Sequence, residues 1–119
     1  MYSAQLLDHF EHPRNAGEVA DANAKAEITN PVCGDVVQLS ARVVAGSIEA
    51  IAFRAKGCVA AMACASAVTE LASGRAMTTA RMLSPDDVER AVGGLSEASH
   101  HASALAIDAL QALLGGFPK

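Results

Sequence analysis

The sequence has few aromatic and few charged residues. It contains no tryptophan, one tyrosine and three phenylalanines, so aromatic residues make up 3% of the chain. Charged residues account for 18%, below the roughly 25% of typical soluble domains. The hydrophobic content of 51% therefore rests mostly on alanine and aliphatic side chains. This composition favours closely packed helices and predicts an apolar face that a partner covers.

Other absences exclude whole classes of protein. The net charge is -4 and no basic cluster occurs, which argues against nucleic acid or an anionic membrane as the main partner. No apolar run is long enough to span a bilayer, and no secretion signal is recognisable. We therefore expect a cytoplasmic protein with reduced thiols, and an odd count of three cysteines disfavours a disulfide framework. The 119 residues contain no linker and are predicted to form a single domain, 1–119.

A β-hairpin is predicted in the first half of the chain, with strands at 36–44 and 48–55. Apolar and polar side chains alternate along both segments, as in strands with one buried face. A two-residue turn at 46–47 would set the apolar face of one strand against the polar face of the other, so we expect a three-residue loop. Two registers remain: Leu39 opposite Phe53 with Ala41 opposite Ile51, or Ala41 opposite Phe53 with Val43 opposite Ile51.

Helices and one further strand flank the hairpin. The segment 26–29 can add an edge strand. The expected helices run from the N-cap Ser3 to Pro13, from Cys58 to Ala72, from Ser84 to about Val92, and from near Ser99 to Gly115. Their expected apolar faces are Leu6, Leu7 and Phe10 in the first helix and Ala102, Leu105, Ala106, Ala109, Leu110 and Leu113 in the last. These elements indicate an α+β fold, a small antiparallel sheet of about three strands covered by helices.

Three residues with metal-ligating side chains converge at the open end of this hairpin. Cys33 and Asp35 precede its first strand, and Cys58 follows its second. Odd-numbered positions should face the core, so that Cys33 and Asp35 point inward. Cys58 would point the other way on a regular strand, and the metal interpretation therefore requires Gly57 to break the strand.

The ligand set is incomplete without a further donor, since a four-coordinate site needs at least one more. His100 and His101, at the start of the last helix, are the candidates. Taken separately, each histidine is interpreted as solvated or as part of the helix start rather than as a ligand. Cys33 and Cys58 can also be inert core residues, because free cysteine is among the most buried residue types.

The other cysteine and histidine residues are assigned more ordinary roles. Cys58 begins a helix and has Lys56 nearby, so its thiol is expected to form a thiolate readily. Cys64 lies too far around the helix to share a metal with Cys58 and is interpreted as a small core residue. His9 and His12 are interpreted as solvated side chains near a helix C-terminus rather than as ligands.

Four segments of the sequence resemble the iron–sulfur cluster assembly scaffolds of the IscU/NifU type. They are 8–15 (DHFEHPRN), 30–35 (NPVCGD), 53–58 (FRAKGC) and 68–70 (VTE). The resemblance implies that fold and makes Cys33, Asp35, Cys58 and His101 the ligands of a cluster. Ala102 stands where the family has a third cysteine, and Cys64 on the middle helix does not replace it.

The resemblance also implies a cofactor and partners. The expected cofactor is an iron–sulfur cluster of the [2Fe-2S] type, with zinc in the isolated protein. The expected partners are a cysteine desulfurase and acceptor apoproteins. The protein is expected to be a carrier rather than an enzyme, and a role as sulfur acceptor and a homo-oligomeric state are left open. The segment 95–99 stands where IscU-type scaffolds have Leu-Pro-Pro-Val-Lys, so their dedicated chaperone is a doubtful partner. The insertion that marks the SufU branch is absent.

Two other interpretations remain open because Ala102 removes a thiolate from the site. Cys33, Cys58, Asp35 and His101 also suit zinc, which predicts a relative that assembles no cluster and binds or regulates a desulfurase. A paralogue that binds no metal is the third interpretation.

Overall fold

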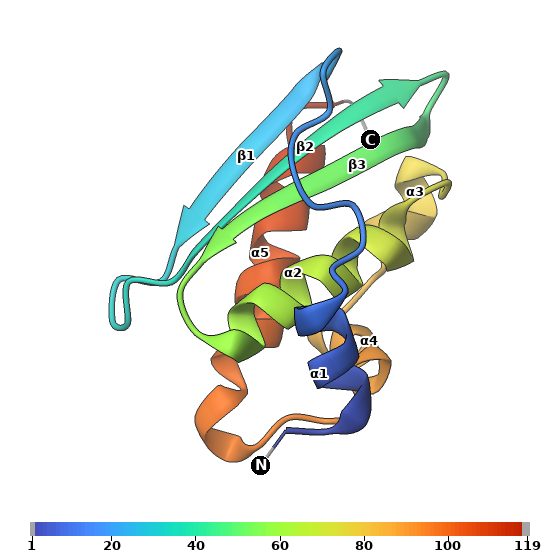
Figure 1. Ribbon diagram of the computed structural model, residues 1–119. Helices are drawn as coiled ribbons and strands as arrows, with labels where there is room; N and C mark the ends of the chain where they lie inside the picture. Colours follow the sequence, from blue (N-terminus) through green and yellow to red (C-terminus); the bar gives the residue numbers. More distant parts are fainter. Residues whose placement is uncertain (1, 118–119) are drawn as a thin grey trace.

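The computed structural model describes residues 2–117, in which helices cover one face of a three-stranded antiparallel sheet (Figure 1). The strands are β1 (Ala24–Thr29), β2 (Val36–Val44) and β3 (Ser47–Lys56), in the order β1-β2-β3. The helices are α1 (Ala4–Glu11), α2 (Val59–Ala72), α3 (Met77–Ala80), α4 (Pro85–Ala91), the 3-10 helix η1 (Glu97–Ser99) and α5 (His101–Leu114). The predicted α+β fold is therefore confirmed. None of the helices within 2–117 combines the length and the apolar character needed to cross a bilayer.

The core lies between the sheet and the two long helices α2 and α5. Helix α2 is buried on nearly all sides because alanine, serine and cysteine fill most of its positions and let neighbouring elements approach closely. Helix α5 buries the apolar face predicted for it, which is confirmed for Ala102, Leu105, Ala106, Ala109, Leu110 and Leu113. Against these helices β2 turns Val37, Leu39 and Ala41, all fully buried.

The hairpin has the first of the two predicted registers, with Leu39 opposite Phe53 and Ala41 opposite Ile51. Its turn differs from the prediction. Val44 pairs with Ser47, so the loop contains only Ala45 and Gly46, both with positive φ as a tight hairpin turn requires. An irregularity between Arg42 and Val43 shifts the register by one residue. Because of this shift, the short turn is compatible with the pairing of Leu39 with Phe53 and of Ala41 with Ile51.

One edge of the sheet is partly covered by another segment of the chain, and in the described part of the chain the other edge is not. The outer edge of β3 is covered in the middle by the segment 15–17, because the Phe53 N–H donates to the Asn15 carbonyl (2.9 Å) and the Gly17 N–H donates to the Phe53 carbonyl (2.8 Å). The opposite edge is β1, the predicted edge strand, and Figure 1 shows no further strand beyond it. The segment that leads into β1 crosses the face of the sheet opposite the helices (Figure 1).

Helix α1 is held by a polar cluster that the sequence did not predict. Ser3 caps it as expected, but of the predicted apolar face only Leu6 is buried, and Leu7 and Phe10 are exposed. The prediction that His9 is solvated was wrong. His9 is buried, its Nδ1 lies 2.8 Å from Ser66 Oγ on α2, and burial lowers the pKa of its imidazole.

The same cluster joins two of the segments on which the family resemblance rests. The Arg14 N–H donates to Ser66 Oγ (2.9 Å), and the Thr69 hydroxyl donates to the Arg14 carbonyl (3.2 Å). Glu70 lies 3.7 Å from His9 Nε2 and 3.6 Å from Arg14 Nε. Residues 8–15 and 68–70 thus fasten α1 and the following loop to α2, which is a structural role.

Candidate metal centre

The loop between β1 and β2 presents the first two predicted ligands. The Asn30 N–H donates to the Asp35 carbonyl (2.8 Å), and the Gly34 N–H donates to the Asn30 carbonyl (2.8 Å), which closes the loop tightly. Gly34 has φ +78, a conformation that favours glycine. The loop turns Asp35 inward, where it is 4% exposed, and leaves Cys33 exposed. The inward orientation predicted for Asp35 is confirmed, and that predicted for Cys33 was wrong because the ladder stops before it.

Gly57 allows Cys58 to approach Asp35. Strand β3 ends at Lys56 and Gly57 has φ +140, so the chain leaves the strand where the metal interpretation required it. A Cβ atom at Gly57 would lie 2.1 Å from Asp35 Oδ1. With no side chain there, the Cys58 N–H donates to Asp35 Oδ1 (3.2 Å) and its thiol donates to Oδ2 (3.1 Å).

His101 completes the cluster from the first residue of α5. Its Nε2 lies 3.3 Å from Asp35 Oδ2 and 4.0 Å from Cys58 Sγ. One donor atom each from Cys33, Asp35 and His101 lies within 4.8 Å of the others, a spacing compatible with a shared metal ion. The His101 side chain is 35% exposed, so the centre opens to solvent at the end of the sheet. The structure thus brings Asp35 together with all three of the other predicted ligands.

The protonation of the centre follows from its burial. Burial by itself would raise the pKa of Asp35, but hydrogen bonds from Cys58, Cys33 and His101 together lower it. The pKa of the Cys58 thiol is raised, first by burial and then by the hydrogen bond to Asp35, although the Ala61 N–H donates to its sulfur (3.3 Å). The prediction that Cys58 readily forms a thiolate was therefore wrong. The two pKa shifts together place the proton on the Cys58 thiol and the negative charge on Asp35.

The remaining candidates lie outside the centre. His100 is more exposed and its Nε2 lies 3.3 Å from Glu89 on α4. Cys64 is fully buried, and burial raises the pKa of its thiol to about 12, as expected of a core cysteine. Ala102 is fully buried directly after His101. The sequence did not predict the glycine-to-carboxylate contact, although the pair Gly57-Cys58 after a strand was the signal that pointed to it.

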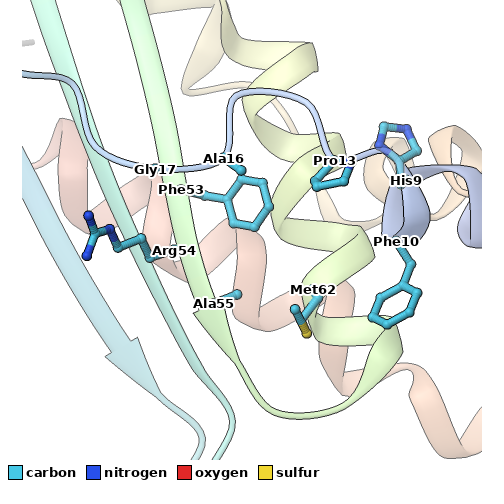
Figure 2. Close-up of a pocket in the computed structure, with 9 residues that line it drawn as sticks. All are labelled: His9, Phe10, Pro13, Ala16, Gly17, Phe53, Arg54, Ala55 and Met62. Atoms are coloured by element: carbon cyan, nitrogen blue, oxygen red, sulfur yellow. The ribbon is translucent and has the colours of Figure 1, made fainter.

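A pocket of about 240 Å³ lies between α1, β3 and α2. Figure 2 shows Phe10, Phe53 and Met62 reaching it from these three elements, with Arg54 pointing away. It contains no cluster of ligating side chains, and its one titratable lining residue on α1 is His9, which belongs to the polar cluster under that helix. The metal-ligating chemistry is therefore confined to the end of the sheet among residues 2–117.

Comparison with known proteins identifies the family. The scaffold protein IscU 1 of Archaeoglobus fulgidus, named for iron–sulfur cluster assembly, is 42% identical over 111 residues, which cover 93% of this chain and 72% of that protein. The IscU scaffold protein of Escherichia coli is 34% identical over 120 residues, covering 98% and 93%. One similar crystal structure is that of a candidate iron–sulfur cluster assembly scaffold for the SUF system from Fervidobacterium islandicum. It superposes with a TM-score of 0.77 at 20% identity, over 95% of this chain and 96% of that one. At this identity the likeness is one of fold.

The match extends to the whole sequence. The NifU-like N terminal domain matches residues 1–119. It includes all four segments on which the resemblance was based, and the fold is the one implied by it. On these findings, the chain belongs to the family of NifU-like N-terminal domains.

Proposed function

We propose that this protein is a scaffold on which an iron–sulfur cluster is assembled and from which it is passed to acceptor proteins. The proposal is carried by the convergence of Cys33, Asp35 and His101 within 4.8 Å, with Cys58 Sγ 3.1 Å from Asp35 Oδ2. The relatives named as cluster assembly scaffolds support it. A cysteine desulfurase would supply the sulfur, and the cluster, of the [2Fe-2S] type, is cargo rather than a resident cofactor.

The mixed donor set suits a cargo that must be released. Thiolate sulfur is the preferred ligand of iron–sulfur clusters, whereas carboxylate is a harder donor and a poorer match. Cys33 and Cys58 would supply the sulfur ligands, and Asp35 and His101 the weaker ones. Since Ala102 leaves the centre without a third thiolate, we expect a cluster that dissociates readily.

Cluster binding is coupled to proton release. Because the pKa of Cys58 is raised and its thiol donates to Asp35, iron must displace that proton before the sulfur can coordinate it. Asp35 accepts hydrogen bonds from the Cys58 thiol and N–H, so the carboxylate is held where it can coordinate the same ion. Loading is therefore expected to be favoured by higher pH.

A second candidate function is supported by the same donor set. Two thiolates, one imidazole and one carboxylate also make a four-coordinate zinc site, and Ala102 removes the ligand that would favour a cluster. In that case the protein would bind zinc and regulate a desulfurase without assembling clusters. The two candidates differ in whether iron and sulfide are retained together.

Anaerobic reconstitution tests both candidates. The protein is incubated with ferrous iron, a cysteine desulfurase, cysteine and a dithiol reductant, which reduces the persulfide sulfur to sulfide, and is then desalted. Visible absorption, iron, sulfide and zinc are measured, and transfer to an apo-ferredoxin is followed. We expect absorption with matching iron and sulfide contents, abolished by Cys33→Ser and by Cys58→Ser. Cys64→Ala, which also removes one cysteine but lies in the core, is the matched control and should retain the cluster.

The outcomes separate the interpretations. Retention of zinc without sulfide, lost in the same two variants, would favour the zinc-binding candidate. Unchanged iron and sulfide in Cys33→Ser and Cys58→Ser would show that the cluster is held elsewhere and would refute the assignment of the centre.

A further inference from the structure

Strand β1 leaves one edge of the sheet open for pairing. In an antiparallel ladder, residues whose backbone groups bond to one neighbour alternate with residues whose backbone groups point the other way. The Asn30 N–H donates to the Asp35 carbonyl in the register that continues the β1–β2 pairing, so even-numbered residues of β1 bond to β2. The backbone N–H and C=O groups of Lys25, Glu27 and Thr29 therefore point away from the sheet.

The other side of the sheet gives an independent check of this alternation. Odd-numbered residues of β2 bond to β1, so even-numbered ones bond to β3. In the part of β3 from Ala50 to Lys56, before the register shift, the backbone groups of the odd-numbered residues must therefore face outward. Phe53 does so, since its N–H and carbonyl bond to Asn15 and Gly17. Within 2–117, no such covering segment bonds to the outer edge of β1.

The sequence of this edge is complementary to itself when read in the opposite direction. Ala24, Ala26 and Ile28 lie on the face packed against the core and are half-buried, and Lys25 and Glu27 are exposed on the other face. About Ala26 the order is apolar, charged, apolar, charged, apolar, with a positive charge on one side and a negative charge on the other. Glu27 forms no ion pair with any other residue that the structure describes, and Lys25 Nζ only a long one of 3.9 Å with Glu18.

We infer that a second copy of this chain pairs with β1, antiparallel and in one register, to form a continuous six-stranded sheet. A two-fold axis passes beside Ala26, which lies opposite its own counterpart. Lys25 then lies opposite Glu27 of the second copy, and Glu27 opposite Lys25. These are the residues whose backbone groups point outward, so each of the two pairs exchanges both hydrogen bonds.

Charge selects this register from its neighbours. A shift that placed the axis at Lys25 or at Glu27 would set two like charges directly opposite each other, which is destabilising. A shift of one strand by a single residue would place residues whose backbone groups point outward opposite residues whose backbone groups point to β2. No hydrogen-bonded pairs could form in that register, so it is excluded. At the axis, Ala26 pairs without hydrogen bonds, where the Cα atoms approach to about 4.5 Å and a small side chain fits.

The pairing leaves the metal centres free. Cys33 and Asp35 follow the C-terminal end of β1, and the two strands run in opposite directions, so the two centres lie at opposite ends of the joined sheet. Cluster assembly and pairing are thus separable, and failure of one test leaves the other unaffected. A contact of one short strand from each copy is small, and we expect a transient dimer.

Charge exchange tests the register directly. Sedimentation velocity is measured over protein concentrations up to about 1 mM, since weak self-association appears only there. Lys25→Glu and Glu27→Lys should each weaken dimerisation at least about tenfold, because each converts two attractive pairs into two repulsive ones. The double variant Lys25→Glu/Glu27→Lys should restore it. Lys56→Glu, on the same face but on β3, is the matched control and should dimerise like the original protein.

The two single variants change the net charge in opposite directions, so a general charge effect cannot produce the same loss in both. Hydrogen exchange adds a backbone readout: the amides of Lys25 and Glu27 should exchange more slowly as concentration rises, and that of Ala26, already bonded to β2, should not change. A protein that stays monomeric throughout, single variants that dimerise normally, or a double variant that is not restored would each overturn the inference.

Discussion

Replacing Gly57 by alanine should disrupt the centre because the added methyl group has no space. An ideal Cβ there would lie 2.1 Å from Asp35 Oδ1 and 2.6 Å from its Cγ, whereas ordinary contacts begin at 3.4 Å. The carboxylate would have to retreat by more than an ångström. That movement would break its hydrogen bonds with the Cys58 N–H and thiol.

The size of the effect can be estimated from two contributions. An alanine at φ +140 is strained by about 1–3 kcal/mol. Loss of hydrogen bonds to a buried carboxylate adds about 1.5–3 kcal/mol. We therefore expect Gly57→Ala to lower the free energy of unfolding by about 2.5–6 kcal/mol, a large part of the 5–15 kcal/mol typical of a domain. Metal binding should be lost at the same time.

Gly17→Ala is the matched control for backbone strain. Gly17 has φ +120, but a Cβ there would meet no atom within 4 Å. This variant should lose only about 1–3 kcal/mol and should bind metal normally. Urea unfolding of both variants gives the free energies, and metal content after incubation with iron or zinc and desalting gives the second readout.

A double-mutant cycle isolates the clash. In an Asp35→Ala background the carboxylate is gone, so Gly57→Ala should be less destabilising there, with a coupling of about 1–3 kcal/mol. Equal losses for Gly57→Ala and Gly17→Ala, or no coupling with Asp35→Ala, would refute the reasoning that Gly57 makes room for the carboxylate.

Three further predictions concern the last helix, the polar cluster and the first helix. Ala102→Cys should prolong the lifetime of a reconstituted cluster in the presence of a chelator, and His101→Ala should shorten that lifetime roughly tenfold. The decay of the cluster is measured by its visible absorption. Equal decay rates of the original protein and Ala102→Cys would mean that position 102 does not face the cluster. Because burial lowers the pKa of His9, the folded protein keeps the imidazole neutral, and its stabilising contribution is present above about pH 6.5. That contribution is lost as the pH falls through this value towards the lower folded-state pKa. Urea unfolding midpoints between pH 8 and pH 5 should therefore fall less in His9→Gln than in the original protein, and parallel curves would contradict this. Ser3→Ala removes a hydroxyl that accepts a hydrogen bond from the Leu6 N–H (2.9 Å) and donates to the Val92 carbonyl, and it should lower stability by about 0.5–2 kcal/mol in the same assay. Ser3→Thr, which keeps both hydrogen bonds, should stay close to the original.

The sequence by itself determined the elements whose signals are local. The alternation of apolar residues in 36–44 and 48–55 predicted the hairpin and included the observed register, because one buried face makes a slip costly. The cap at Ser3 and the start at Ser84 were likewise predicted correctly, since capping depends on residues within one turn of helix. Family resemblance then pointed to the centre through short motifs around Cys33 and Cys58.

The tertiary structure decided what depends on contacts between distant residues. The two-residue turn at 45–46 escaped prediction because Ala45 adopts a positive φ that its residue type does not suggest, and a register shift near Arg42 compensates for it. His9 can be buried because Ser66, far away in the sequence, supplies the hydrogen bond that satisfies its imidazole. No periodicity within the first helix contains that information.

The protonation of Cys58 shows the same division most clearly. Its place at a helix N-terminus was readable from the sequence, and by itself would lower the thiol pKa. The fold adds burial and a carboxylate from Asp35, both of which raise that pKa and reverse the local expectation. The glycine that lets the two side chains meet lies next to Cys58, but the clash that requires glycine there exists only because the hairpin brings Asp35 against it.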